Sequence, residues 1–107
     1  MAAVIWADPA LQDLDAIADY IALDKPDAAR GLVQEVFAQV DRLRKFPKMG
    51  SVPAEIPDLP YRQLVIPPCR VFYRIGRGRV YIVHAMRGEQ LLKRDLLERR
   101  IGSLEGL

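Results

Sequence analysis

Apolar residues recur at intervals of three and four along two stretches in the first half of the chain, a spacing that predicts two amphipathic helices. A short apolar run, AAVIW at residues 2–6, precedes the first stretch and predicts a strand. The apolar stripe of the first helix comprises Leu11, Leu14, Ile17, Ala18 and Ile21. The stripe of the second helix comprises Leu32, Val33, Val36, Phe37, Val40 and Leu43. Only the tripeptide LDK separates them, so the two helices should form an antiparallel hairpin.

Proline residues mark the limits of these helices. Pro9 and Pro26 stand in their first turns, where a proline interrupts no helical hydrogen bond, and Pro47 ends the second helix. Residues 47–60 hold further prolines and Gly50, which prevent regular secondary structure. We expect this segment to be one long loop within a single domain.

Three runs rich in β-branched and aromatic residues follow the loop and predict strands. They are YRQLVI, CRVFYRI and RVYIVHAM, at residues 61–66, 69–75 and 79–86. The GRG between the last two runs predicts a tight hairpin turn at Arg77-Gly78. The three strands should therefore form an antiparallel meander.

The hairpin turn sets the register of the last two strands, because successive side chains point to opposite faces of a sheet. The predicted pairs are Ile75 with Val80, Tyr73 with Ile82, and Val71 with His84. These six side chains share one mostly apolar face, which should pack on the helices. The opposite face should present Arg70, Phe72, Arg74, Tyr81, Val83 and Ala85, with Arg87 just beyond the strand.

The last segment places four leucines among charged residues and predicts a short C-terminal helix, or a segment that folds only against a partner. The leucines are Leu91, Leu92, Leu96 and Leu97. The sequence thus predicts one α+β domain over residues 1–107, with residues 91–107 as its C-terminal helix or tail. The expected order is β-α-α-β-β-β and a C-terminal helix, with the helical hairpin packed on a twisted antiparallel sheet.

Charge is distributed unevenly along the chain, although the overall net charge is only +2. Residues 1–61 hold six Lys/Arg and ten Asp/Glu, for a net charge of −4. Residues 62–100 hold ten Lys/Arg and three Asp/Glu, for a net charge of +7. A one-sided basic field indicates an anionic partner, which could be nucleic acid or an acidic polypeptide segment.

Soft metal ligands are scarce, since Cys69 is the only cysteine and His84 the only histidine. A single cysteine excludes an internal disulfide, and these two residues are too few for a zinc site. No stretch approaches the roughly 20 apolar residues that a membrane span requires. We expect a cytoplasmic protein with no metal, no cofactor, no membrane partner and no small-molecule ligand.

Five segments occur in an order and at a spacing that are typical of one superfamily. They are DLDAIADYIA, PDAAR, L..FP.MG, YRQL and YRIGRGRVYIVHAMRG. On these segments the chain resembles the RelE/ParE superfamily of type II toxin-antitoxin toxins. The resemblance implies a small α/β fold and a cognate antitoxin that wraps the toxin with an extended or helical segment. It also implies one of two activities, since RelE-like members cleave mRNA on the ribosome and ParE-like members inhibit DNA gyrase.

The two activities require different residues. Metal-free RNA cleavage needs a base, an acid and cations that stabilise the phosphate charge. By resemblance, Arg70 matches the strand arginine that RelE-like toxins use on the phosphate, and Arg87 is its possible companion. His84 or Glu89 would then be the acid or base. Where the RelE nucleases carry further Lys, Arg, His or Tyr, however, this chain has Gly88, Glu89 and Gln90.

This incomplete set favours a ParE-like toxin that inhibits DNA gyrase without catalysis and is neutralised by a cognate antitoxin with an acidic segment dotted with apolar residues. The alternative is a RelE-like, ribosome-dependent and metal-independent mRNA endoribonuclease. A third possibility is a toxin-like fold retained only for binding. The residues expected to contact the target or the antitoxin are Arg70, Phe72, Arg74, Tyr81, Arg87, Leu91, Leu92 and Leu96.

Ordinary structural roles compete with these assignments. Arg70, Arg74 and Arg87 could simply form the solvated face of a sheet. His84 should be a structural histidine bonded to the backbone or to a helix residue. Cys69 should be a passive, half-buried thiol.

Helix residues with suggestive chemistry have similar explanations. Asp13, Asp15 and Asp19 could be read as paired catalytic carboxylates, but their spacing is typical of a solvated helix face. Trp6 and Tyr20 occupy ordinary core positions. We assign no function to any of these five residues.

Overall fold

The protein is an α+β domain, and the computed structural model describes residues 1–105, with side chains as far as residue 100. Residues 106–107 of the predicted tail lie outside the described residues. In chain order the elements are β1 (Ala3–Trp6), α1 (Asp8–Ala22), α2 (Pro26–Asp41), the 3-10 turn η1 (Arg42–Arg44), β2 (Arg62–Ile66), β3 (Cys69–Gly76), β4 (Arg79–Arg87) and α3 (Arg94–Glu105). The predicted element order is therefore confirmed.

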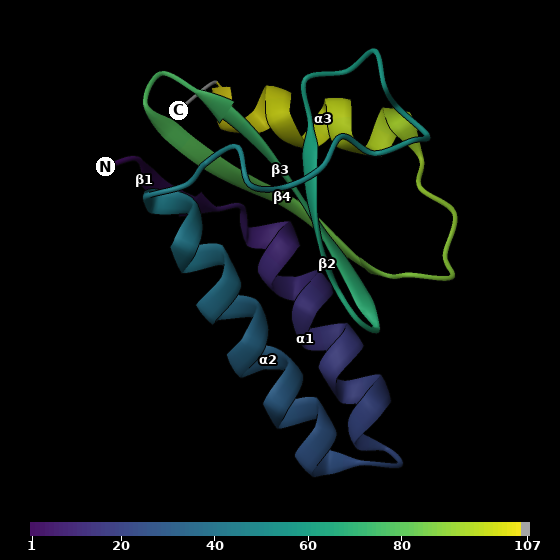
Figure 1. The fold of residues 1–107 in the computed structure, drawn as a ribbon. Helices are drawn as coiled ribbons and strands as arrows, with labels where there is room; N and C mark the ends of the chain where they lie inside the picture. The colour runs from purple at the N-terminus through teal and green to yellow at the C-terminus, as the bar shows by residue number, and fades with distance from the viewer. Residues whose placement is uncertain (106–107) are drawn as a thin grey trace.

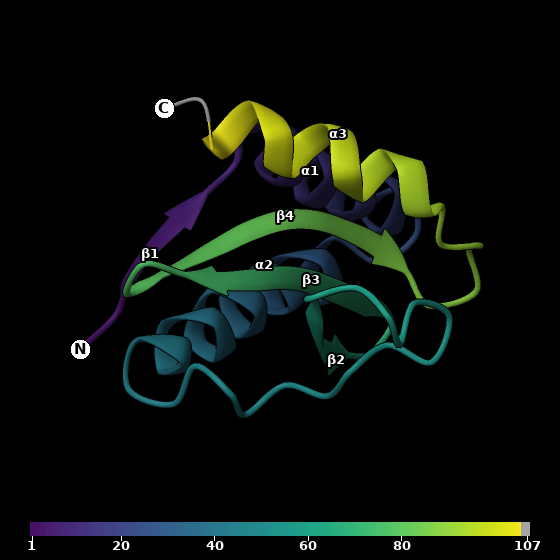
Figure 2. The same cartoon turned by 90° about the horizontal axis from the view of Figure 1, so that it is seen from above.

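The helices lie in two layers with the sheet between them. The hairpin of α1 and α2 packs on one face, which we call the hairpin face, and α3 packs on the other, the α3 face (Figure 1). Figure 2 shows α3 lying along β4, which it contacts. The strand order is β1-β4-β3-β2. One detail differs from the prediction of an antiparallel sheet: β1 runs parallel to β4, so the sheet is mixed.

The β3–β4 hairpin follows the predicted register over its first half. Ile75 lies opposite Val80 and Tyr73 opposite Ile82. The turn residues Arg77 and Gly78 both have positive φ, at 55° and 71°, as a two-residue type I′ turn requires.

A register shift between Phe72 and Tyr73 makes the rest of the predicted pairing wrong. Val71 lies opposite Ala85, and His84 lies opposite Phe72. The cause is a β-bulge, in which two residues of one strand oppose one residue of the other, so that every later side chain changes face. Ala85 consequently joins the core under the helical hairpin, although the unbroken alternation predicted it on the opposite face.

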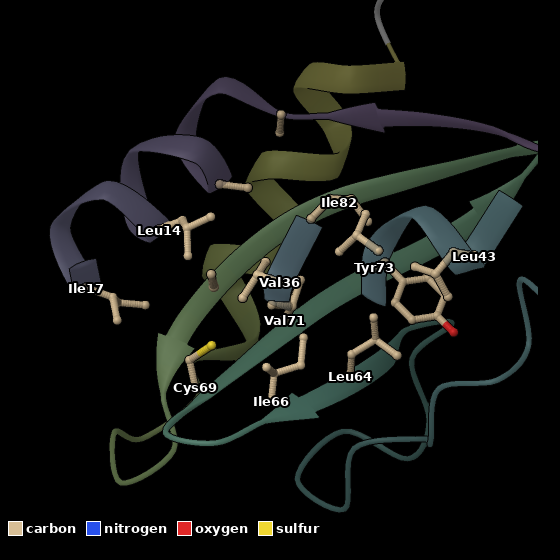
Figure 3. Packing of buried hydrophobic residues seen from close by; sticks show 14 of the residues in the cluster. Leu14, Ile17, Val36, Leu43, Leu64, Ile66, Cys69, Val71, Tyr73 and Ile82 are labelled. Atoms are coloured by element: carbon tan, nitrogen blue, oxygen red, sulfur yellow. The ribbon is translucent and has the colours of Figure 1, made fainter. Parts of the chain in front are cut away.

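The main core lies between the helical hairpin and the sheet. Figure 3 shows Leu14 of α1, Val36 of α2 and Val71 of β3 converging in this layer. Other fully or almost fully buried members are Ile17, Val40, Leu43, Tyr73, Val80 and Ile82. Each such side chain stabilises the fold by roughly 1.5–3 kcal/mol relative to full exposure. The helical stripes read from the sequence thus supply one side of this core.

A second core lies on the α3 face. Its buried members are Ile56, Tyr61, Phe72, Val83, Met86, Leu92 and Leu97. Leu97 of α3 is fully buried, and its carbonyl accepts a hydrogen bond of 3.2 Å from the Tyr61 hydroxyl. The face predicted to carry an open arginine surface is therefore covered at its centre by α3 and by the 47–60 loop.

The FP.MG motif belongs to the anchor of the 47–60 loop. The Tyr73 hydroxyl donates to the Pro47 carbonyl at 2.7 Å and accepts from the Gly50 N–H at 3.0 Å. Arg62 donates to the Gly50 carbonyl at 2.7 Å. A Cβ atom at position 50 would lie 2.6 Å from both the Gln63 carbonyl oxygen and the Tyr73 hydroxyl, so only glycine fits there.

Candidate functional site

Arg70 is held inside the protein by an acidic partner from the loop. Its two terminal nitrogens donate to the two carboxylate oxygens of Glu55 at 2.7 and 2.8 Å, and its Nε donates to Gln63 at 2.9 Å. The guanidinium also lies 4.9 Å from the ring centre of Phe72, and only 13% of the Arg70 side chain is exposed. The hydrogen bonds from Arg70 lower the pKa of the Glu55 carboxyl below its ordinary value. Arg70 is thus already occupied by an internal anion.

Arg87 lies against α1. It ends β4 opposite Cys69, and its guanidinium is 4.3 Å from the ring centre of Tyr20. Its Nε is 3.4 Å from a carboxylate oxygen of Glu89. Tyr20 is 59% exposed, so the prediction of a core position for this residue is wrong, whereas Trp6 is partly buried against Phe37. Arg87 and Tyr20 border an open hollow of about 300 Å³.

The two arginines occupy opposite faces of the sheet. Arg70 and Phe72 are two residues apart on β3, so their side chains point to the same face of the sheet, the α3 face. Arg87 faces the helical hairpin, because residues directly opposite in a ladder point the same way and Cys69 belongs to the main core. A single phosphate group between Arg70 and Arg87 is therefore incompatible with this arrangement.

His84 joins a charged cluster at the edge of β4. Strand β1 pairs with β4 only as far as Ile82. Beyond Ile82, the edge of β4 that faces away from β3 therefore has no neighbouring strand. There the Asp13 carboxylate accepts from the Ala85 N–H at 3.2 Å, and Arg100 of α3 donates to the Val83 carbonyl at 3.0 Å. These side chains satisfy the edge backbone that β1 does not reach.

Within this cluster, Asp13 links α1, β4 and α3. The Nδ1 atom of His84 lies 2.9 Å from Asp13 Oδ2, and Arg100 also binds this carboxylate. Burial alone would raise the pKa of Asp13, but the hydrogen bonds from His84, Arg100 and the Ala85 N–H outweigh it and hold the pKa below its ordinary value. The prediction that Asp13 is solvated is wrong, while Asp15 and Asp19 are exposed as expected.

The structural role predicted for His84 agrees with these contacts, although its predicted face does not. Its ring stacks on Phe72 with 5.7 Å between ring centres. Cys69 is fully buried rather than half-buried, and burial raises the pKa of its thiol to about 11. A thiol with this pKa is not a nucleophile near neutral pH.

The other residues predicted to bind a target are distributed between core and surface. Phe72 and Leu92 are buried in the second core, and Tyr81 packs against it. Arg74 lies opposite Tyr81 and is partly buried. Leu96 is partly buried, and Leu91 is 81% exposed. The predicted continuous surface is therefore not assembled. Of its members, Leu91 is exposed and Arg87 adjoins the exposed ring of Tyr20, a residue that the prediction had not included in this surface.

Sequence reasoning missed a second hollow, at the start of the 47–60 loop. It measures about 510 Å³ and is lined by Arg42, Phe46, Pro47, Lys48 and Met49. Phe46 is 54% exposed, which is unusual for a phenylalanine next to a structured loop. The juxtaposition of apolar and basic residues in RLRKFPKM was the available signal.

Among the described residues, no group of three or more His, Cys, Asp or Glu side chains is arranged to hold a metal ion. Within residues 1–105, no helix is long and apolar enough to cross a bilayer.

Comparison with known proteins identifies the family. Residues 4–92 match the family described as the ParE toxin of the type II toxin-antitoxin system parDE. The chain belongs to the ParE toxin family. It is thus a toxin of a type II toxin-antitoxin system within the RelE/ParE superfamily, as the resemblance implied, and such a system implies a cognate antitoxin partner.

Two relatives extend the comparison. The chain is 36% identical over 91 residues to Toxin RelE2 of Caulobacter vibrioides, a match that covers 81% of this chain and 99% of the relative. A solved structure of the chromosomal ParDE system from P. aeruginosa is similar with a TM-score of 0.71 and 28% identity, and covers 83% of this chain and 98% of that one. The residues matched to the ParE family, 4–92, end before α3 begins at Arg94.

Proposed function

We propose that this ParE toxin inhibits DNA gyrase without catalysing a reaction and that its cognate antitoxin neutralises it in the cytoplasm. The observation that carries the proposal is that the groups RNA cleavage would need do not converge on one site. Arg70 is bound to Glu55, His84 lies against Asp13, and Arg87 lies on the opposite face of the sheet from Arg70.

Ribonuclease chemistry requires those groups to converge on one phosphate. The base must reach the attacking 2′-hydroxyl, the acid must reach the leaving oxygen, and a cation must lie beside the phosphate. Here a phosphate at Arg70 would have to displace a carboxylate held by two charge-assisted hydrogen bonds. Arg87 could not assist it from the opposite face of the sheet.

The accessible parts of the predicted surface support inhibition by binding. Arg87 stacks on the exposed ring of Tyr20, and Leu91 extends nearby in sequence with most of its surface in solvent. Arginine and tyrosine are among the residue types that contribute most to the binding energy of protein interfaces. We assign gyrase contact to this surface, from Tyr20 and from residues 87–91.

The competing function is ribosome-dependent cleavage of mRNA. It is favoured by the 36% identity to a relative whose name is Toxin RelE2. Retention of the fold for binding alone is the third candidate. Short induction of the toxin in cells separates the three functions, with plasmid supercoiling and 5′ ends of translated mRNA as the two readouts.

The proposal predicts relaxed plasmid or gyrase-dependent DNA breaks together with intact mRNA. Cuts in phase with codons would identify a ribonuclease instead. Normal growth with neither change would leave a binding module.

A further inference from the structure

The hollow lined by Phe46 and Met49 has the character of a binding site for an apolar side chain. It lies at the junction of η1 and the 47–60 loop, and none of its lining residues belongs to the proposed gyrase surface. Its volume of about 510 Å³ falls within the range of roughly 300–1,000 Å³ that is usual for ligand sites. Phe46 presents about half of its side chain to this space.

Hydrogen bonds hold the backbone of the hollow in place. The Phe46 N–H donates to the Arg42 carbonyl at 2.9 Å, and the Met49 N–H donates to the Phe46 carbonyl at 3.2 Å. The Pro47 carbonyl accepts from the buried Tyr73 hydroxyl, which ties this segment to the main core. A site fixed in advance in this way loses little conformational entropy when a partner binds.

The charge around the hollow is positive. Arg42 and Lys48 line it, and Lys45 lies between them in the sequence. Among residues 1–100, none of these three cations has a carboxylate within ion-pair distance. The nearby Arg44, by contrast, binds Asp41 at 2.8 Å. This basic group belongs to the half of the chain that is acidic overall.

We propose that the Phe46 hollow receives an apolar side chain of an acidic segment of the cognate antitoxin. This inference rests on the proposed function for its partner and names a contact outside the basic half of the chain. The apolar floor would bury the anchor, and Arg42, Lys45 and Lys48 would face the acidic residues that flank it. Gyrase itself would be a different occupant, and the test distinguishes it from the antitoxin.

The test measures binding of the purified antitoxin, expressed from the adjacent reading frame, to toxin variants. Phe46→Ala should weaken binding at least tenfold, because the anchor loses its apolar contact. The double variant Arg42→Glu/Lys48→Glu should weaken it similarly and reduce its salt dependence. The matched controls are Leu23→Ala, which removes an 86% exposed side chain, and Arg77→Glu/Arg79→Glu, which reverses two exposed charges at the hairpin turn. Both controls should stay within about twofold of wild type.

Unchanged melting temperatures would show that the Phe46 and Arg42/Lys48 variants fold normally. Wild-type affinity of Phe46→Ala for the antitoxin would overturn the inference and leave the proposed function intact. Wild-type antitoxin binding with lost gyrase inhibition would also overturn it, since the occupant would then be the target. Failure of wild-type toxin to bind the antitoxin at all would instead contradict the antitoxin component of the proposed function.

Discussion

Arg70 and Glu55 form a two-bonded ion pair that joins strand β3 to the 47–60 loop, with nitrogen–oxygen distances of 2.7 and 2.8 Å. The pair neutralises the arginine that the family resemblance would assign to a phosphate. It also argues against both explanations offered for this arginine, a solvated sheet face and a site for an external anion, because Arg70 is largely buried and already bound to Glu55. Its role in this chain is to hold the loop.

Replacement of Glu55 by glutamine tests this role. Glu55→Gln should release part of the hold on Arg70 and lower the free energy of unfolding by only about 0.5–1 kcal/mol, because Glu55 is 38% exposed and solvent screens the pair. Mapping of mRNA 5′ ends should show intact message with this variant, as with wild type. New cuts in phase with codons would mean that Glu55 had been restraining a ribonuclease.

A methyl group at position 50 tests the loop anchor. Gly50→Ala should destabilise the protein by about 1–3 kcal/mol, because the added Cβ would lie 2.6 Å from a backbone carbonyl oxygen. Gly31→Ala is the matched control: position 31 lies in α2 with nothing within 4 Å of an added Cβ, so the change should stabilise by up to about 1 kcal/mol. Urea unfolding of both variants measures the difference. Equal stabilities would show that the Gly50 contact yields without cost.

The charged cluster at Asp13 predicts a dependence of stability on acid. The pKa of Asp13 is lower in the folded protein than its ordinary value of 3.8, so its contribution is complete above that value and is lost as the pH falls through the folded pKa. Asp13→Asn should therefore cost about 1–3 kcal/mol near neutral pH. The difference from wild type should shrink as the pH falls below 3.8.

Urea unfolding of wild type and Asp13→Asn at a series of pH values gives this difference directly. The contributions of Glu55 and Asp58, whose pKa values are also lowered by their arginine partners, are common to both proteins and cancel. A difference that stays constant down to the lowest pH would show that the carboxylate charge of Asp13 does not stabilise the fold.

The sequence predicts the strands well up to the point where a bulge interrupts the alternation. Alternating apolar residues and the Arg77-Gly78 turn are local signals, and they correctly predict that Ile75 pairs with Val80 and Tyr73 with Ile82. The bulge beyond Phe72 leaves no such local signal. The residue that the ladder skips, Val83 of β4, continues the apolar run of its strand and packs in the second core with Leu97 of α3, which follows later in the chain.

Long-range contacts likewise explain what sequence reasoning missed in the candidate site. The helical pattern correctly places Asp13 off the apolar stripe of α1, but its partner Arg100 lies 87 residues away. The acidic Glu55 is visible in the sequence, whereas its pairing with Arg70 depends on the path of the 47–60 loop. The sequence was sufficient to predict which helix or loop carries each acidic residue, but not which arginine it binds.

The most direct measurement of the central claim is DNA supercoiling by purified gyrase in the presence of the purified toxin, with an RNA substrate incubated in parallel. We expect supercoiling to fall as toxin is added and the RNA to stay intact. Arg87→Ala should require about tenfold more toxin, equivalent to about 1.4 kcal/mol of binding free energy, while Arg77→Ala should match wild type. Full gyrase activity at an excess of folded toxin would contradict the account.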